Sequence, residues 1–413
     1  TTQPGIFAGA VESWDIPAPD GEPGEVDEAR RLAARAVATA RGDDGGSPRP
    51  VHVNMALREP LSSPDAGEII EAVLAMPAIE PRPSSVVHLT VTAELEPGPE
   101  TVVIAGAGAG ERAEQLARDL GAPLLAEVGS GARFGPNLVV AYRALLRDPV
   151  QFPVRRAIVV GRPTLSREVG SLVAQPGVET IGVRGIGAED YDPGRRMTRI
   201  VDEAVVPTPA DSKDPAVRER VGRWVAASRA LVGEGDDIAP AIDAPDGEFA
   251  RGELAAVRAS VTRRTLVEAV WRATWPHDRL VLGASRLIRE LDGAVPGKRV
   301  PVHTNRGLAG IDGTIATAIG IAQASQDPPG DDPTSTGTTR VLLGDLAMLH
   351  DVGALALAPG ERRPRIQVIV GDDGGGTIFD LLEVGKQPGP AFDRVMRTPQ
   401  PVRLAELAAA FGW

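Results

Sequence analysis

The stretch "VLLGDLAMLHD", Val341–Asp351, places a carboxylate between a short apolar run and an amphipathic one. The aliphatic residues before Gly344 predict a buried strand, and the residues after Asp345 have the spacing of a helix. Open α/β sheets bind their ligands at such junctions, outside the carboxyl ends of the strands. Asp345 is therefore the first candidate for a functional residue.

A pair of acidic residues, Asp372 and Asp373, ends the next apolar run, "RIQVIVGDD". Asp372 lies 27 positions after Asp345, which fits one helix and one returning strand. A right-handed crossover would then bring both strand ends to the same edge of a sheet. Two carboxylates with the glycine backbone that follows would form an oxygen-only site suited to Mg²⁺ or Ca²⁺. The alternative is that Gly-Asp and Asp-Asp-Gly are ordinary turn signals.

Two further segments place candidate ligand-binding groups at strand ends. In "NRGLAGIDG", a glycine-rich loop leads into a predicted helix, which is an arrangement that can hold a phosphate or a carboxylate. Arg306 could bind a carboxylate there, and Ile311 could either pack against a ligand or plug the loop from below. In "LGASRLIRELDG", Ser285 has the position of a helix N-cap, and Arg289 follows one turn later on the same side. The alternative is an exposed Arg289 paired with a carboxylate of its own helix.

Composition limits the class of protein. The 413 residues are 42% hydrophobic, enough for two or three domains with real cores. The net charge of −12 argues against a general affinity for nucleic acid. The absence of cysteine excludes disulfides and thiolate metal sites. No apolar run has the length of a membrane span, and the opening "TTQPGIFAGA" has no basic region followed by an apolar one, so we expect a cytoplasmic protein.

The order of elements predicts an α/β fold with successive doubly wound parallel-sheet domains. Domain boundaries are predicted at 1–63, 64–212 and 213–413. The predicted strands are 50–57, 101–108, 122–127, 156–163, 180–185, 278–285, 299–305, 339–345 and 365–373. The predicted helices include 25–42, 110–121, 138–146 and 252–275.

Some motifs favour other functions only weakly. "VVIAGAGAGER" imitates a dinucleotide fingerprint, and Glu127 falls where a ribose-binding acid would lie, but Gly106, Gly108 and Gly110 do not have the required spacing. The five histidines lack metal-ligand spacing. His350 could reach the site of Asp345 or lie on a helix surface.

Taken together, "NRGLAGIDG", "GDLAMLHD" and "GGGTIFDLLE" resemble the diphosphate-binding domain of thiamine-diphosphate enzymes, and more narrowly the MenD family of menaquinone biosynthesis. "TQPGIFAG", "VHVNMALREPL" and "GRP" agree with that family, so the resemblance covers nearly the whole chain. It implies a thiamine-diphosphate-binding fold in which 1–63 is the end of a pyrimidine-binding domain, 64–212 a central Rossmann-like domain and 213–413 the diphosphate-binding domain, incomplete at its C-terminus.

The resemblance implies a role for each matching residue. Mg²⁺ or Mn²⁺ would be bound by Asp345, Asp372 and the carbonyl group of Gly374. Thiamine diphosphate would be bound by Gly310, Ile311, Gly344, Asp345, Gly374 and Gly375, with Ile311 wedged beneath the cofactor. Ser285, Arg289 and Arg306 would bind substrate carboxylates, and Ile378, Phe379 and Leu382 would form an apolar wall. Arg162, in "GRP", would be a substrate contact near the entrance of the site. Asparagine is usual in this family near Asp372 and Asp373, so which of the two binds the metal stays open.

The implied reaction decarboxylates 2-oxoglutarate and adds the resulting carbanion to isochorismate. The alternatives are another thiamine-diphosphate 2-oxoacid decarboxylase or synthase, and a non-catalytic nucleotide-binding module. The implied partners are these small molecules and a second copy of the chain, with a homodimer as the minimum and a homotetramer left open. The family's pyrimidine-activating glutamate matches no residue of this sequence, and the C-terminal "AELAAAFGW" stops in the middle of a predicted helix, so we expect a protein that is longer at both ends.

Overall fold

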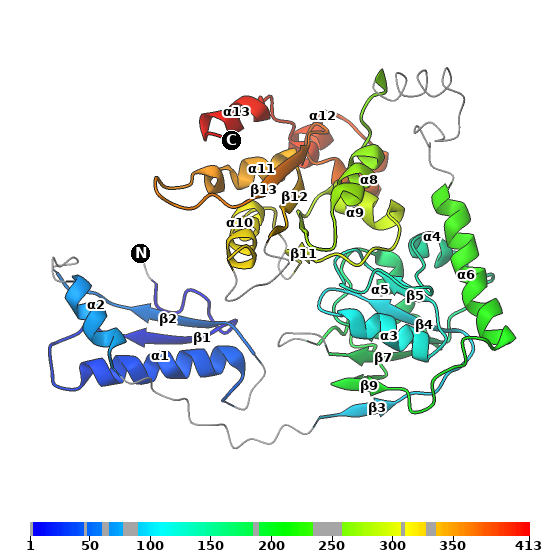
Figure 1. The fold of residues 1–413 in the computed structure, drawn as a ribbon, viewed down its shortest axis with the longest axis horizontal. Helices are drawn as coiled ribbons and strands as arrows, with labels where there is room; N and C mark the ends of the chain where they lie inside the picture. Colours follow the sequence, from blue (N-terminus) through cyan, green and yellow to red (C-terminus); the bar gives the residue numbers. More distant parts are fainter. Residues whose placement is uncertain are drawn as a thin grey trace. The chain divides into compact units, whose positions relative to one another are not determined.

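The computed structural model describes residues 3–44, 48–59, 66–76, 90–184, 190–233, 258–306, 310–327 and 336–413. The chain divides into two compact units, Thr1–Val91 with Ile186–Asp190, and Thr92–Gly185 with Tyr191–Trp413 (Figure 1). The three-domain division at residues 63 and 212 stays a prediction.

The smaller unit contains a β-α-β arrangement. Strands β1 (Glu12–Ile16) and β2 (Val51–Met55) pair in parallel, and helix α1 (Glu25–Arg41) lies between them in sequence. Gly24 and Gly42 have φ angles of 102° and 78°, left-handed conformations that glycine adopts without strain, and they bound α1 as predicted for residues 25–42. Helix α2 (Ala66–Leu74) follows.

The larger unit begins with a parallel five-stranded sheet of order β5-β4-β6-β7-β8. Successive side chains of β4 point to opposite faces of the sheet, and both faces are buried. Val103 and Ala105 pack with α3, whereas Val102 and Ile104 pack with α4, α5 and α6. Burial of both faces explains the continuous apolar runs of these strands. The elements are β4 (Thr101–Ala105), α3 (Glu111–Asp119), β5 (Leu124–Ala126), α4 (Tyr142–Leu145), β6 (Arg156–Val160), α5 (Arg167–Val173), β7 (Glu179–Val183), β8 (Arg199–Val201) and α6 (Pro215–Gly233), with β3 (Thr92–Glu94) and β9 (Glu203–Val205) paired separately.

The second sheet of this unit is also parallel, with the order β11-β10-β12-β13. Leu280, Leu282 and Leu342 pack with α8 and α9, while Val281 and Val341 pack with α10 and α11. Figure 1 shows these helices around the sheet. The elements are α8 (Arg263–Ala273), β10 (Arg279–Leu282), α9 (Arg286–Ala294), β11 (Val302–Thr304), α10 (Thr314–Ser325), β12 (Thr339–Gly344), α11 (Asp345–His350), β13 (Ile366–Gly371), α12 (Pro390–Phe392) and α13 (Leu404–Ala410), with short helical turns at Val352–Leu355, Thr377–Leu381, Glu383–Lys386 and Asp393–Arg397.

The predicted α/β class with doubly wound parallel sheets is confirmed. The helix predicted at 138–146 is shorter, because the N–H of Val139 bonds to the carbonyl of Leu124 and so draws the preceding residues to the edge of β5. The helix predicted at 252–275 is interrupted. Residue 258 is helical but residues 259–262 are not, and α8 begins after Thr262, whose side chain caps it; residues 252–257 lie outside the described ranges. None of the helices in the described ranges is long and apolar enough to cross a membrane.

Candidate active site

The carboxyl ends of the four strands in the second sheet bring the predicted site residues to one edge. Arg306 follows β11, Ser285 follows β10, Asp345 follows β12 and Asp372 follows β13. The residues that immediately precede the two aspartates, Gly344 and Gly371, pair across β12 and β13, so the predicted common edge is confirmed. The strand order reverses direction between β10 and β12, and such a switch point leaves a crevice for ligands.

A cavity of about 100 Å³ lies at this switch point. Its wall contains seven of the predicted site residues: Ser285, Ile311, Gly344, Asp345, Gly375, Ile378 and Phe379. Six others are not on the wall formed by the described residues: Arg289, Arg306, Gly310, Asp372, Gly374 and Leu382. Sequence reasoning missed Arg286 and Thr377, which also line the cavity. The run of three glycines before Thr377 was the signal that could have found it.

Asp345 is the first residue of α11 and is only 5% exposed. Its Oδ2 accepts a hydrogen bond from the N–H of Gly375 at 2.7 Å. Burial raises the pKa of Asp345, and the charges of Asp372 and Asp373 act in the same direction, against the N–H groups of Leu346 and Gly375. Three carboxylates thus repel one another at this edge, and a cation would relieve that repulsion.

The two aspartates after β13 have different surroundings. Asp373 forms an ion pair with Arg263 and accepts a hydrogen bond from Thr377 Oγ1 at 2.6 Å. Asp372 is exposed, and its Oδ1 receives the N–H of Gly374 at 3.3 Å. Asp373 lines the cavity but is already paired with Arg263, whereas Asp372 lies off the cavity wall and forms no ion pair within the described residues.

The loop that follows needs glycine for two reasons. Gly374 and Gly375 have φ angles of 84° and 107°, which side chains rarely adopt. A Cβ at Gly375 would also lie 2.2 Å from the carbonyl oxygen of Arg397. These glycines let the backbone approach Asp345 closely, which places their peptide groups beside the carboxylates.

Ser285 and Arg289 lie together at the start of α9. Ser285 is the predicted N-cap, since its Oγ accepts the N–H of Leu287 at 3.2 Å, and Arg289 Nη1 donates to its carbonyl oxygen at 3.2 Å. Burial lowers the pKa of Arg289, and the positive charges of Arg306 and Arg143 add to that effect. Mutually repelling guanidinium groups would be stabilised by an anionic ligand.

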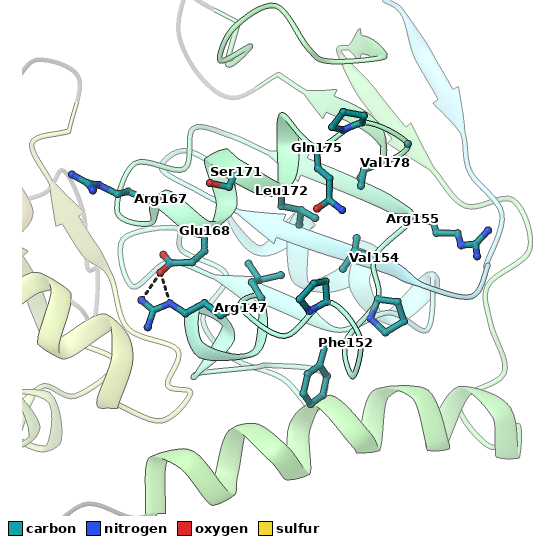
Figure 2. Close-up of a pocket in the computed structure, with 15 residues that line it drawn as sticks. Arg147, Phe152, Val154, Arg155, Arg167, Glu168, Ser171, Leu172, Gln175 and Val178 are labelled. Carbon is teal, nitrogen blue, oxygen red and sulfur yellow. Dashed lines mark hydrogen bonds and ion pairs between the residues drawn. The ribbon is translucent and has the colours of Figure 1, made fainter. Parts of the chain in front are cut away.

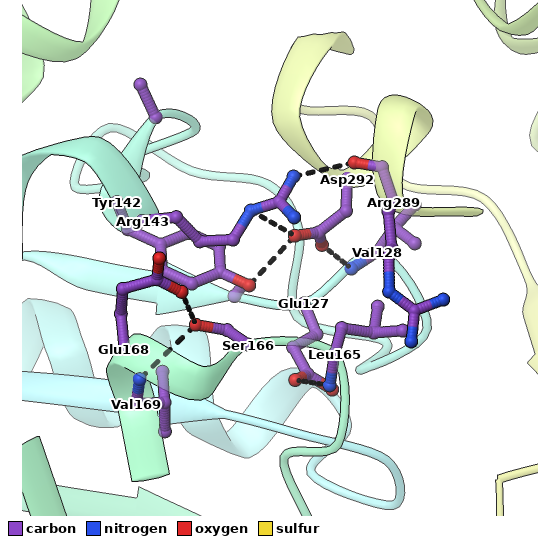
Figure 3. A network of polar contacts seen from close by, with 12 residues as sticks. Glu127, Val128, Tyr142, Arg143, Leu165, Ser166, Glu168, Val169, Arg289 and Asp292 are labelled. Carbon is purple, nitrogen blue, oxygen red and sulfur yellow. Dashed lines mark hydrogen bonds and ion pairs between the residues drawn. The ribbon is translucent and has the colours of Figure 1, made fainter. Parts of the chain in front are cut away.

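The same-helix carboxylates considered for Arg289 have other partners. Glu290 bonds to Arg286 at 3.1 Å. Asp292 is completely buried and belongs to a polar network that joins α9 to the central sheet (Figure 3). Its carboxylate accepts hydrogen bonds from the N–H of Val128 and from Tyr142 Oη, each at 2.8 Å. The arrangement therefore fixes the helix that carries Ser285 and Arg289.

Glu127 is a buried glutamate beside this network (Figure 3). Its Oε1 accepts the N–H groups of Thr164 and Leu165 at 2.8 and 2.6 Å. Burial raises the pKa of Glu127 from 4.5 to about 8, and the charge of Asp292 adds to that effect, while the two N–H groups and the charge of Arg306 oppose it. The folded protein therefore favours the neutral carboxyl group.

We expect Glu127→Gln to be more stable than the wild type at pH 9 and equally stable near pH 4. A raised pKa in the folded state means that stability is lost as pH rises from the unfolded value of 4.5 through about 8. The difference between these two pKa values corresponds to a loss of at most about 5 kcal/mol in the free energy of unfolding, at about 1.36 kcal/mol per pKa unit. Urea unfolding of both proteins from pH 4 to pH 9 measures the difference. A difference that is independent of pH would contradict the expectation.

Other sequence candidates lie elsewhere. His350 is exposed at the end of α11. The loops after β4 and β6 close on each other: the backbone groups of Ala107 and Arg162 exchange two hydrogen bonds, at 3.0 and 2.9 Å, and a Cβ at Gly106 would lie 2.1 Å from the nitrogen of Pro163. This packing fills the switch point of the central sheet, where a dinucleotide would bind, and argues against the nucleotide alternative.

A larger cavity, about 530 Å³, lies on the central sheet between the end of α4 and α5 (Figure 2). Its three arginines have carboxylate partners: Arg147 Nε donates to Glu168 at 2.8 Å, Arg167 pairs with Glu383 at 2.8 Å and Arg155 pairs with Glu100 at 2.6 Å. None of the predicted site residues lines it. The cavity at the β10–β12 switch point is therefore the candidate active site.

Comparison with known proteins finds relatives of high sequence identity. The 2-succinyl-5-enolpyruvyl-6-hydroxy-3-cyclohexene-1-carboxylate synthase of Leifsonia xyli subsp. xyli is 53% identical to this chain, over all of the chain and 72% of the relative. The chain belongs to this synthase family. The synthase of Clavibacter michiganensis subsp. michiganensis is also 53% identical, over all of the chain and 71% of the relative.

More distant comparisons add less. The synthase of Nocardioides sp. is 40% identical over 87% of the chain and 63% of the relative. A solved structure, the thiamine diphosphate-dependent 4-hydroxybenzoylformate decarboxylase of Rhodococcus jostii, is 16% identical with a TM-score of 0.48, over 96% of this chain and 70% of that one. No protein-family model matches the chain.

Proposed function

We propose that the chain is a 2-succinyl-5-enolpyruvyl-6-hydroxy-3-cyclohexene-1-carboxylate synthase of menaquinone biosynthesis. Such an enzyme decarboxylates 2-oxoglutarate and adds the resulting succinyl-semialdehyde carbanion to isochorismate. The observation that carries the proposal is the common edge of the second sheet, where carboxylates for a metal-bound diphosphate and cationic groups for anionic substrates follow adjacent strands. Membership of the synthase family supports the same activity.

Thiamine diphosphate would supply the electron sink for decarboxylation and for carbon–carbon bond formation. Asp345, Asp372 and the carbonyl of Gly374 would hold Mg²⁺ or Mn²⁺ at the diphosphate. Within the described residues, no group of three or more His, Cys, Asp or Glu side chains could hold a metal ion. That fits Mg²⁺, which commonly takes one or two carboxylates and completes its shell with water and phosphate oxygens.

The remaining wall residues would orient the reactants. Ile311 would support the cofactor from below, with Gly310, Gly344 and Gly375 allowing its close approach. Ile378 and Phe379 would exclude water on the acceptor side, together with Leu382. Ser285 would donate a hydrogen bond from its hydroxyl group to a substrate carboxylate, and Arg289 and Arg306 would neutralise the negative charge of the substrates. Residues 307–309 of the glycine-rich loop lie outside the described ranges.

A test combines the full-length gene product with thiamine diphosphate, Mg²⁺, 2-oxoglutarate and isochorismate. Mass spectrometry should detect the succinylated cyclohexene product only when both substrates are present. Carbon dioxide release without that product would favour the alternative of another 2-oxoacid decarboxylase. A protein that binds neither cofactor nor substrates would leave the non-catalytic module as the remaining function.

The assembly and the location are proposed on the resemblance alone. We propose a homodimer as the minimum, with a homotetramer open, acting in the cytoplasm. Sedimentation of the full-length protein with and without cofactor would measure the oligomeric state, and a monomer that is fully active would contradict the proposal.

A further inference from the structure

Glu127 has no role in the proposed reaction, yet its buried carboxyl group contacts Thr164, which in turn contacts Arg306. We propose that Glu127 is a positioning residue for Arg306: it fixes the backbone of Thr164 and Leu165, and Thr164 in turn holds the Arg306 guanidinium in the orientation that binds a substrate carboxylate. This inference rests on the proposed function, which makes Arg306 a substrate-binding residue.

The first link joins Glu127 to the loop after β6. One carboxyl oxygen receives two successive N–H groups, those of Thr164 and Leu165, at 2.8 and 2.6 Å. Glu127 itself follows β5 directly, and its own N–H bonds to the carbonyl of Ala105 at 2.9 Å. The loop is therefore held to the frame of the central sheet by a side chain that is only 3% exposed.

The second link joins that loop to the other sheet of the same unit. Arg306 Nε donates to Thr164 Oγ1 at 3.0 Å, and Arg306 Nη2 donates to the Thr164 carbonyl oxygen at 3.1 Å. Two bonds to one residue fix the plane of the guanidinium group. They also leave the Nη1 group, for which the described residues show no hydrogen bond, to face a ligand.

The charges around Glu127 explain why a glutamate can serve here. The charge of Asp292, on α9, raises the pKa of Glu127, and the charge of Arg306, after β11, lowers it. The charge of Glu127 in turn raises the pKa values of Tyr142, on α4, and of Tyr191. Both tyrosines have pKa values raised above 10, so neither titrates near neutral pH. The raised pKa of Glu127 keeps the carboxyl group neutral near pH 7, which leaves the Arg306 charge available to an anionic substrate.

The test compares Glu127→Ala and Glu127→Gln with the matched pair Glu114→Ala and Glu114→Gln in the full-length enzyme. Glu114 is a buried glutamate of α3, a helix that packs on the same central sheet; its pKa is also raised by burial, and it pairs with Arg118 at 3.2 Å rather than with the 164–165 backbone. We expect Glu127→Ala to raise the KM of the substrate bound by Arg306 roughly tenfold or more, with a smaller change in kcat. Glu127→Gln should restore most of that loss, because its amide oxygen can accept the same two N–H groups.

The pH profile and a double variant separate positioning from a merely structural role. Wild-type KM should rise above about pH 8, where the ionised Glu127 competes for Arg306, and Glu127→Gln should lack that rise. Arg306→Ala with Glu127→Ala should be no worse than Arg306→Ala alone, because both changes remove the same interaction. Additive losses, or equal KM changes in the Glu114 pair, would overturn the inference.

A crystal structure of Glu127→Ala gives a readout that does not depend on activity. Displacement of Thr164 together with Arg306 is expected. Retention of both Thr164–Arg306 hydrogen bonds would overturn the positioning role even in an active synthase. Displacement of the pair in a protein that makes no product and does not bind 2-oxoglutarate would instead refute the proposed function and, with it, the assignment of Arg306 to a substrate.

Discussion

Asp345→Asn is expected to lower kcat/KM of the full-length enzyme about 100-fold or more while leaving the fold intact. Changes to groups that merely support a metal ligand already cost about 10- to 100-fold, and Asp345 would be a ligand itself. Asparagine keeps an acceptor for the N–H of Gly375, so the loop at Gly374–Gly376 should stay in place. What the substitution removes is the charge that would hold a divalent cation.

Stability measurements distinguish loss of cofactor binding from damage to the fold. Burial and the neighbouring aspartates raise the pKa of Asp345, so its charge destabilises the protein without cofactor. We therefore expect Asp345→Asn to melt at the same temperature as the wild type or higher when thiamine diphosphate and Mg²⁺ are absent. The increase in Tm that these ligands give the wild type should disappear, since stabilisation by a ligand depends on its affinity.

The two neighbouring aspartates provide the matched controls for this prediction. Asp372→Asn should reduce the effect of Mg²⁺ on Tm, because the exposed Asp372 is the proposed second ligand. Asp373→Asn should reduce stability even without cofactor, because Arg263 and Thr377 lose their anionic partner. If Asp373→Asn abolished the Mg²⁺ effect and Asp372→Asn did not, the metal ligand would be Asp373 and the proposed assignment of Asp372 would be wrong.

The sequence predicted those parts of the site that depend on local pattern. Asp345 and Asp372 could be placed at strand ends because strand, junction and helix are read within a dozen residues, and parallel topology then determines the shared edge. The N-cap at Ser285 and the position of Arg289 depend on spacing along one helix. These features need no knowledge of distant partners.

What could not be predicted depends on contacts between distant segments. The pairing of Asp373 with Arg263 joins residues 110 positions apart, and it gives a cationic partner to the aspartate that lines the cavity. The bonds of Arg306 to Thr164 span 142 positions, and those of Asp292 to Val128 span 164. No periodicity encodes such pairs, so Glu127 was interpretable from the sequence only as a ribose-binding acid.

Asp292→Ala is expected to destabilise the larger unit by about 3–5 kcal/mol, the usual cost of removing one partner from a buried ion pair. Asp292 lies 3.6 Å from Arg133 Nη1 and 3.7 Å from Arg143 Nε, and Arg133 is only 2% exposed. The substitution would leave the charge of Arg133 buried without an anion. It would also remove the acceptor of Tyr142 Oη and of the Val128 N–H.

Urea unfolding measures this cost, and Glu290→Ala on the same helix is the control. Glu290 pairs with Arg286 one turn away at 3.1 Å, and such half-exposed pairs contribute about 0.5 kcal/mol or less. Arg133→Met combined with Asp292→Leu should be less destabilising than the sum of the two single changes, because the pair then disappears together. A loss below about 1 kcal/mol for Asp292→Ala would show that water reaches Arg133 after the change, and that α9 is held to the central sheet by its apolar contacts rather than by this carboxylate.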